Sequence, residues 1–83
     1  MNIFVSNLSF RLNNDELKNV FDEFGEVTSA KIVTDRETGR SRGFGFVEMS
    51  NDSEANIAIE TLNGKEVKGR NISVSVAKPR ENR

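Results

Sequence analysis

The sequence predicts an α+β domain of the ferredoxin-like class, a βαββαβ sandwich in which two helices cover one face of a four-stranded antiparallel sheet. Two observations support this prediction. The hydrophobic pattern changes between the strand period and the helix period in the order β-α-β-β-α-β, and 83 residues allow one small core. With right-handed crossovers, the strands lie in the order 4-1-3-2. We expect a single domain over residues 1–78 and a short C-terminal tail over residues 79–83.

The first half of the chain supplies a helix between two strands. Residues 3–6 are mainly β-branched or aromatic and predict a short strand. Residues 13–24 predict a helix, because amide and acidic residues open the segment and Gly25 follows it. Its apolar residues recur at the i, i+3, i+4 and i+7 positions of a buried face, namely Leu17, Val20, Phe21 and Phe24. Residues 27–33 predict the second strand.

The second half repeats this arrangement after a hairpin. The polar segment 35–41 predicts a loop, and residues 42–49 predict the third strand. The helix predicted over residues 51–62 ends at the Asn-Gly pair at 63–64. Its apolar stripe consists of Ala55, Ala58, Ile59 and Leu62. Residues 71–76 alternate between polar and apolar side chains, which predicts a final, half-buried strand.

The composition argues against most catalytic and metal-binding functions. The chain has no cysteine and no histidine, so thiolate and imidazole metal ligands, disulfides and the usual serine triad are missing. No apolar run exceeds three residues, which excludes a membrane span and a signal peptide. We expect a soluble cytoplasmic monomer, with the nucleus as an alternative location in a eukaryote, that is not an enzyme and binds no cofactor and no metal.

Strand parity places three phenylalanine rings on the sheet face that no helix covers. In the first strand, Phe4 points away from Ile3 and Val5, which belong to the core. In the third strand, Phe44 and Phe46 share the outer face. Three exposed rings in one patch are unusual for a small domain. Either a flap or a partner protein covers them, or nucleic-acid bases stack on them.

The two strands that carry these rings resemble the two sequence motifs of the RNA recognition motif (RRM) family. Residues 3–8 (IFVSNL) resemble its hexapeptide motif, and residues 42–49 (RGFGFVEM) resemble its octapeptide motif. The resemblance extends over nearly the whole chain and implies non-catalytic binding of single-stranded RNA. The chain resembles the small stand-alone bacterial and organellar glycine-rich RNA-binding proteins in length, but it lacks their glycine-rich tail. A role as RNA chaperone or post-transcriptional regulator follows by analogy alone.

This resemblance implies roles for four residues of the motifs. Phe4 and Phe46 would stack on two bases, Phe44 would pack on the sugars between them, and Arg42 would pair with a phosphate. The last octapeptide position is usually aromatic and is Met49 here. Because parity places Met49 in the core, we expect this departure to alter packing rather than RNA contact.

Two glycines of the octapeptide motif have two interpretations. Gly43 and Gly45 leave the strand without side chains at two positions where bases approach, or they form a bulge or a sharper twist. Both interpretations are compatible with the predicted fold.

The charge is divided between the helices and the rest of the chain. The formal net charge is −1, with 12 basic and 13 acidic residues. The helix over 13–24 has four acidic residues and one lysine, and the helix over 51–62 has three acidic residues and no basic one, so each carries −3. The remainder therefore carries +5. This division predicts an acidic helical back and a basic sheet front that would orient RNA onto the aromatic face.

Further candidate RNA contacts follow from parity, loop position and the resemblance. Glu48 shares the parity of the rings, and its carboxylate could accept hydrogen bonds from a base amine. Arg36 and Arg40 lie in the hairpin loop and could close over RNA or simply be solvated. In the family, a C-terminal extension often crosses the sheet and contacts RNA. The candidates are Lys31, Arg36, Arg40, Glu48, Ser75, Ala77, Lys78 and Arg80.

Two other functions use the same predicted topology. Some RRM-like domains bind peptides, and here the acidic helical face would be the protein–protein interaction surface. An acylphosphatase-like enzyme needs a phosphate-cradling loop with a placed Arg and Asn, and no glycine-rich segment of this chain has that form. The three retained aromatic residues favour single-stranded RNA as the partner, with single-stranded DNA as an alternative ligand.

Overall fold

The main strands and the two helices follow one another in the predicted order β-α-β-β-α-β. The computed structural model describes residues 1–77, and its elements have the following bounds. They are β1 (Asn2–Ser6), α1 (Asn14–Asp22), β2 (Val27–Thr34), β3 (Ser41–Met49), α2 (Asp52–Leu62), β4 (Glu66–Val67), β5 (Arg70–Asn71) and β6 (Ser73–Val76). The short β4–β5 hairpin was not predicted, because two-residue strands are too short to show a hydrophobic period.

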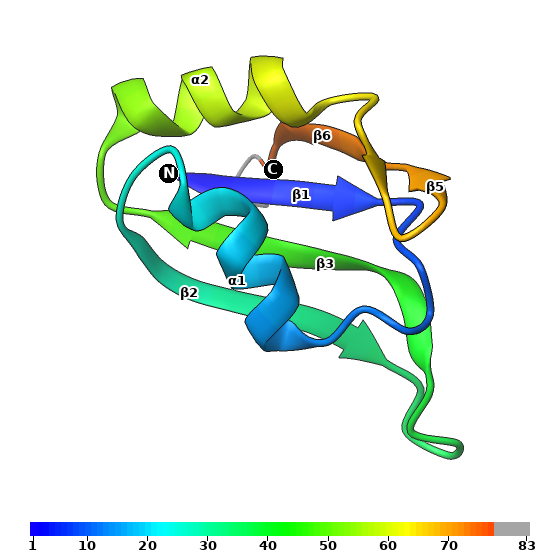
Figure 1. Ribbon diagram of the computed structural model, residues 1–83. Coiled ribbons are helices and arrows are strands. Elements are labelled where there is room, and N and C mark those ends of the chain that lie inside the picture. The colour runs from blue at the N-terminus through cyan, green and yellow to red at the C-terminus, as the bar shows by residue number, and fades with distance from the viewer. Residues whose placement is uncertain (78–83) are drawn as a thin grey trace, which may run out of the picture.

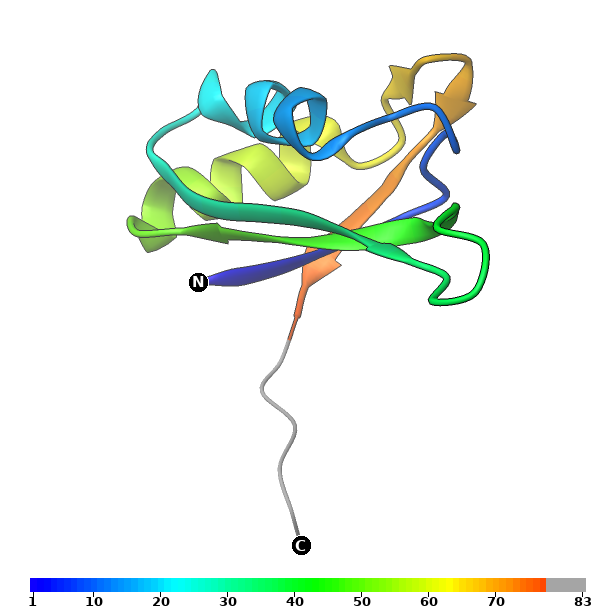
Figure 2. The ribbon, with the colours of Figure 1, turned by 90° about the horizontal axis from the view of Figure 1, so that it is seen from below.

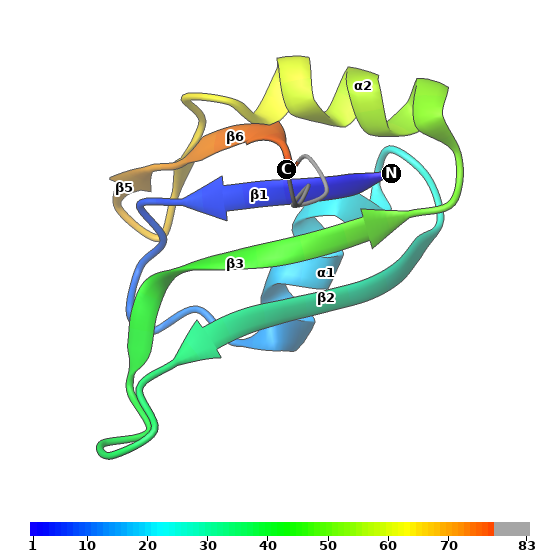
Figure 3. The ribbon, with the colours of Figure 1, turned by 180° about the vertical axis from the view of Figure 1, so that it is seen from behind.

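The main sheet has the predicted topology. Its strands lie in the order β2-β3-β1-β6, and all three neighbouring pairs are antiparallel. With β6 as the fourth strand, this is the predicted order 4-1-3-2. Both helices lie on one side of the sheet (Figure 1), and the edge-on view in Figure 2 separates the helical layer from the sheet layer. Figure 3 shows the opposite face, on which β1 and β3 occupy the centre and on which residues 1–77 place no helix.

The core fills the space between the helices and the sheet. It contains both predicted helical stripes, with Val20, Phe24 and Ile59 partly buried at its margin. The buried hydrophobic residues on the main sheet are Ile3, Val5, Val27, Ile32, Val47, Met49 and Val74, and those on the helices are Leu17, Phe21, Ala55, Ala58 and Leu62. Met49 is fully buried, which confirms its predicted place in the core. Val76 is 44% exposed, because it ends the edge strand β6.

Side-chain caps fix where the two helices begin. The Asn13 side chain accepts a hydrogen bond from the Glu16 backbone N–H, and the Glu16 carboxylate accepts one from the Asn13 N–H, which completes a capping box. Asn51 accepts from the Glu54 N–H in the same way at the start of α2. These caps satisfy N–H groups that the first turn leaves without helical partners.

A hydrogen-bonded turn connects the end of α2 to the last strand. The Asn63 side chain accepts a hydrogen bond from the Val74 N–H at 3.0 Å. Gly64, at φ +87°, donates its N–H to the Ile72 carbonyl at 2.7 Å. Gly64 adopts this left-handed conformation without the steric cost of a β-carbon. The predicted Asn-Gly end of the helix therefore also positions β6 beside β1.

An ion pair ties the β4–β5 hairpin to the first turn of α1. The Lys68 ammonium lies 2.7 Å from the Glu16 carboxylate. The hydrogen bond from Lys68, followed by that from the Asn13 backbone, lowers the pKa of Glu16 below its usual value. Lys68 therefore neutralises part of the acidic helical back instead of adding to a basic sheet front.

Within residues 1–77, no helix combines the length and the apolar character that crossing a membrane requires.

Substitution of Phe21 tests the assignment of the core. Phe21→Ala should lower the free energy of unfolding by about 3–5 kcal/mol, because it removes a fully buried ring and leaves a cavity. Urea denaturation measures this change. The control is Ile57→Ala on the outer face of α2, where a side chain 54% exposed should cost at most about 0.5 kcal/mol. A smaller loss for Phe21→Ala than for Ile57→Ala would contradict the assignment.

Candidate nucleic-acid interface

Three phenylalanine rings gather on the sheet face that carries no helix. Phe4 on β1 is directly opposite Phe46 on β3, and their ring centroids lie 5.5 Å apart. The Phe44 ring lies 5.8 Å from that of Phe4 and 6.5 Å from that of Phe46, edge-on to the latter. Phe46 is 45% exposed, and the other two are half-buried. The sheet register thus brings the three predicted residues into one aromatic cluster.

The cluster is the centre of a row of side chains that crosses the whole sheet. Lys31 on β2 lies opposite Phe46, and Ser75 on β6 lies opposite Phe4. Directly opposed residues of antiparallel strands project on the same face of a sheet. Lys31 and Ser75 are both exposed. The row therefore has a cation at one end, two rings in the middle and a hydroxyl at the other end.

Glu48 lies in the next row of the same face. It is opposite Asn2 on β1 and Ser29 on β2, and all three residues are exposed. A carboxylate here repels phosphate groups but accepts hydrogen bonds from the amino groups of bases. Asn2 adds an amide that both donates and accepts. This row can therefore distinguish bases by their hydrogen-bonding edges.

The two glycines of β3 are required for different structural reasons. Gly45 is buried on the helix side, and a β-carbon there would lie 2.6 Å from the Lys31 carbonyl oxygen. It lies opposite Ile32, next to an irregularity in the β2–β3 register. The register irregularity beside Gly45 agrees with the bulge interpretation, and the close approach of the β2 backbone leaves no room for a side chain at this position. Gly43 has φ +84°, which is costly for a residue with a side chain, and its carbonyl accepts the Leu8 N–H.

The loop predicted between β2 and β3 forms a hydrogen-bonded turn. The Asp35 backbone N–H donates to the Arg40 carbonyl at 2.7 Å. The Asp35 carboxylate accepts hydrogen bonds from the backbone N–H groups of Glu37 at 2.7 Å and Thr38 at 3.2 Å. The turn presents Arg36 and Arg40 with exposed side chains at one end of the sheet.

The charge of Asp35 helps to hold this turn together. The N–H groups of Glu37 and Thr38 lower the pKa of its carboxyl group, and the nearby Arg42 guanidinium lowers it further. Arg42 itself is exposed on β3, two residues before Phe44 and with the same parity. A cation therefore lies next to the turn, two residues along β3 from Phe44.

The predicted C-terminal contacts lie at or beyond the end of the described chain. Ala77 is half-buried, and its N–H donates to the Asn2 carbonyl at 2.9 Å, which continues the line of β6 along β1. Lys78 and Arg80 lie outside the described residues. Within residues 1–77, no three His, Cys, Asp or Glu side chains lie close enough together to hold a metal ion.

Sequence reasoning missed a fourth aromatic residue near the interface. Phe10, in the loop between β1 and α1, is 65% exposed. The Arg70 guanidinium lies 5.7 Å from its ring centroid. The available signal was a large aromatic residue that belongs to neither the preceding strand pattern nor the following helical stripe.

A family model for the RNA recognition motif matches residues 3–73. The chain belongs to the RNA recognition motif family. RbpA of Synechocystis sp., whose name describes it as an RNA-binding protein, is 53% identical over 83 residues, which are 100% of this chain and 82% of that protein. This RRM is thus similar to a small cyanobacterial protein of that name, in agreement with the expected resemblance in length to small bacterial RNA-binding proteins.

Solved RRM structures agree with the architecture described above. The crystal structure of RNA Binding Protein PG1 superimposes with a TM-score of 0.93 at 49% identity, over 99% of this RRM and 99% of that chain. A chain of the Sxl-lethal protein/RNA complex superimposes with a TM-score of 0.90 at 31% identity, over 96% of this RRM and 48% of that chain. The predicted ferredoxin-like fold is confirmed.

The turn at Asp35 should depend on pH in the acidic range. The pKa of Asp35 is lower in the folded state than its ordinary value of 3.8, so the carboxylate stabilises the turn. This contribution is fully present above pH 3.8 and is lost as the pH falls through the folded-state pKa. In an NMR titration, the Glu37 and Thr38 amide signals should shift together with the Asp35 carboxyl signal.

The matched control for this titration is Asp35→Asn. The amide keeps an acceptor oxygen but carries no charge, so the Glu37 and Thr38 signals should lose their acidic transition. A transition in the parent protein centred above pH 3.8 would contradict the account.

Proposed function

We propose that this RRM binds single-stranded RNA, without catalysis, by stacking bases on the aromatic cluster of Phe4, Phe44 and Phe46. The observation that carries the proposal is the register of β1 and β3, which sets Phe4 opposite Phe46 on the helix-free face. Phe4 and Phe46 each take one base, and Phe44 packs against the sugars between them. Single-stranded DNA offers the same base faces and is a second ligand for the same surface.

Basic residues around the cluster supply phosphate contacts. Lys31 lies beside Phe46, Arg42 lies near Phe44, and the turn carries Arg36 and Arg40. Each phosphate that a cation neutralises releases counterions, so binding weakens as salt rises. At the other end of the row, the Ser75 hydroxyl offers a neutral hydrogen bond to a base or a sugar.

The C-terminal end of the chain extends this surface in the proposal. Ala77, the last described residue, lies beside Asn2 at the edge of the Glu48 row, and Lys78 and Arg80 lie outside the described residues. Lys78 and Arg80 add phosphate contacts there, as in the C-terminal extension of related domains.

The energetics imply weak binding by one domain. Stacking contributes about 1–3 kcal/mol per base, and two or three bases therefore contribute about 2–9 kcal/mol. Association costs about 4–15 kcal/mol in lost freedom. We expect affinity for a short RNA in the micromolar range or weaker, with a role in RNA chaperoning or regulation exercised through weak, reversible contacts.

The helical side offers less support for the alternative of a peptide-binding surface. Of the large hydrophobic residues that are exposed within residues 1–77, only Ile57 lies on a helix. A stable protein interface needs a buried apolar centre, and one isolated side chain does not provide it.

The stacking proposal predicts the effect of removing two rings. The double substitution Phe4→Ala with Phe46→Ala should weaken binding of a short single-stranded RNA by about 2–6 kcal/mol, which abolishes it at micromolar concentrations. Fluorescence anisotropy with a labelled RNA measures the loss, and thermal unfolding verifies that the variant is folded. Ile57→Ala on the opposite side should bind like the parent protein. Unchanged affinity of the double variant would refute the stacking mechanism.

The Glu48 row predicts a change in base preference. Glu48→Gln should change the ratios of affinity among short RNAs of adenine, cytosine, guanine and uracil by about tenfold, because a charged acceptor becomes a neutral amide. The matched control is Glu60→Gln on α2, which removes the same charge from the helical side. If Glu48→Gln changes the affinity for all four bases equally, the residue does not read bases.

A further inference from the structure

Phe10 is an exposed aromatic side chain that does not belong to the hydrophobic core. It is 65% exposed, more than any ring of the aromatic cluster. Its ring leans against the backbone of β3, where a β-carbon on Gly43 would lie 3.3 Å from the Phe10 Cε1 atom. Gly43 directly precedes Phe44 in the chain. The ring therefore lies at the end of the sheet, adjoining the cluster but outside it.

A network of polar contacts positions a cation on this ring. The Arg70 guanidinium lies 5.7 Å from the Phe10 ring centroid, and its Nη2 donates a hydrogen bond to Asn7 Oδ1 at 2.9 Å. The Asn7 side chain in turn donates to the Asn71 carbonyl at 2.7 Å. Asn7 also has φ +58°, a conformation that asparagine tolerates better than most residues. The β4–β5 hairpin thus holds Arg70 in place over Phe10.

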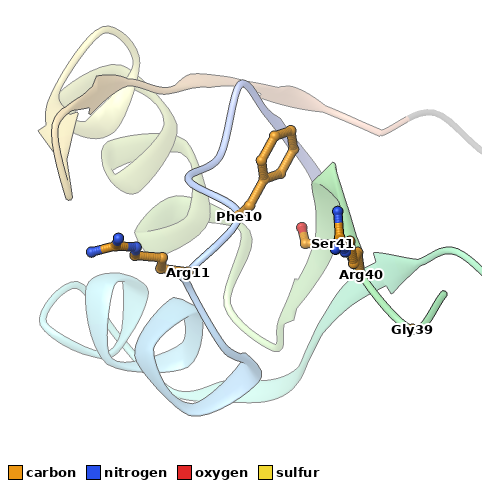
Figure 4. Close-up of a pocket in the computed structure, with 5 residues that line it drawn as sticks. All are labelled: Phe10, Arg11, Gly39, Arg40 and Ser41. Carbon is orange, nitrogen blue, oxygen red and sulfur yellow. The ribbon is translucent and has the colours of Figure 1, made fainter.

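A hollow opens beside the ring, between the β1–α1 loop and the turn that joins β2 to β3. Its volume is about 820 Å³, within the range of small-ligand sites. In Figure 4 the Phe10 ring has Ser41 and Arg40 on one side, whereas Arg11 extends in the opposite direction. None of the lining residues is acidic, and the lining consists of Phe10, Arg11, Gly39, Arg40 and Ser41. The hollow is therefore complementary to an anion that carries a flat ring.

We propose that this hollow binds one further nucleotide of the RNA strand, as a second stacking subsite beyond the aromatic cluster. The base stacks on the face of Phe10 that Arg70 leaves open, and Arg40 contacts the phosphate. The subsite adjoins the cluster along the chain, because the Phe10 ring lies against Gly43, which directly precedes Phe44. The inference rests on the proposed function, since it extends the same bound strand by one nucleotide.

RNA length distinguishes the subsite from the cluster. The probes are labelled homopolymers of each base, about two and about eight nucleotides long, because two nucleotides fill only the cluster, which takes two or three bases. Phe10→Ala should weaken binding of the longer RNA about 5-fold to 100-fold and leave the shorter one unchanged. Phe10→Tyr, which keeps a stacking face, should bind both lengths like the parent protein. Phe10→Ala should remain folded, because its side chain is largely exposed.

A charge-matched pair tests the role of Arg70. Arg70→Gln and Lys65→Gln each remove one exposed positive charge, but only Arg70 lies over the Phe10 ring. Arg70→Gln should weaken binding of the longer RNA more than Lys65→Gln does, at the same salt concentration. Equal effects of the two substitutions would reduce Arg70 to a general contributor of charge and overturn its role in the subsite.

The remaining outcomes separate this inference from the proposed function. If Phe10→Ala binds the longer RNA like the parent protein while the Phe4→Ala, Phe46→Ala variant does not bind, the subsite is wrong and the proposed function stands. Equal losses for both RNA lengths would also overturn the subsite, because Phe10 would then act on the cluster itself. If the Phe4→Ala, Phe46→Ala variant still binds the longer RNA, the proposed function fails instead.

Discussion

The antiparallel pairing of β1 with β3 is the constraint on which the rest of the structure depends. One register sets Phe4 opposite Phe46 and Ile3 opposite Val47. Because neighbouring residues of a strand point to opposite faces, the same register sends the aliphatic side chains into the core and the rings to the helix-free face. A shift by one residue would expose the core and bury the rings. The fold and the candidate interface are therefore two consequences of one pairing.

The division of charge follows the division of faces. Acidic residues in the first turns of α1 and α2 interact favourably with the positive ends of these helices, and both helices lie on the face opposite the aromatic cluster. The Lys68–Glu16 ion pair reduces that acidity locally. Basic residues lie around the helix-free face, with Lys31 beside Phe46 and Arg42 near the turn. A net charge near zero thus agrees with binding on one face, and it leaves most of the affinity to stacking.

The fold and the aromatic cluster could be predicted because their signals are local and periodic. Alternation along β1 and β3 decides which face each ring takes, and the spacing of Leu17 and Phe21 decides which face of α1 is buried. The reason for Gly45 could not be decided, because it depends on a close approach to the Lys31 carbonyl on another strand. The Phe10–Arg70 contact joins residues 60 positions apart, through a hairpin too short to show a period.

The most direct test of the central claim is an NMR titration of the ¹⁵N-labelled protein with a short single-stranded RNA. The account predicts that the largest changes in amide chemical shift fall on β1 and β3, together with upfield shifts of the Phe4 and Phe46 ring protons from stacked bases. Amides of α1 and α2 on the acidic side should keep their positions. Large changes on the two helices, with the ring signals of β1 and β3 unchanged, would contradict the account.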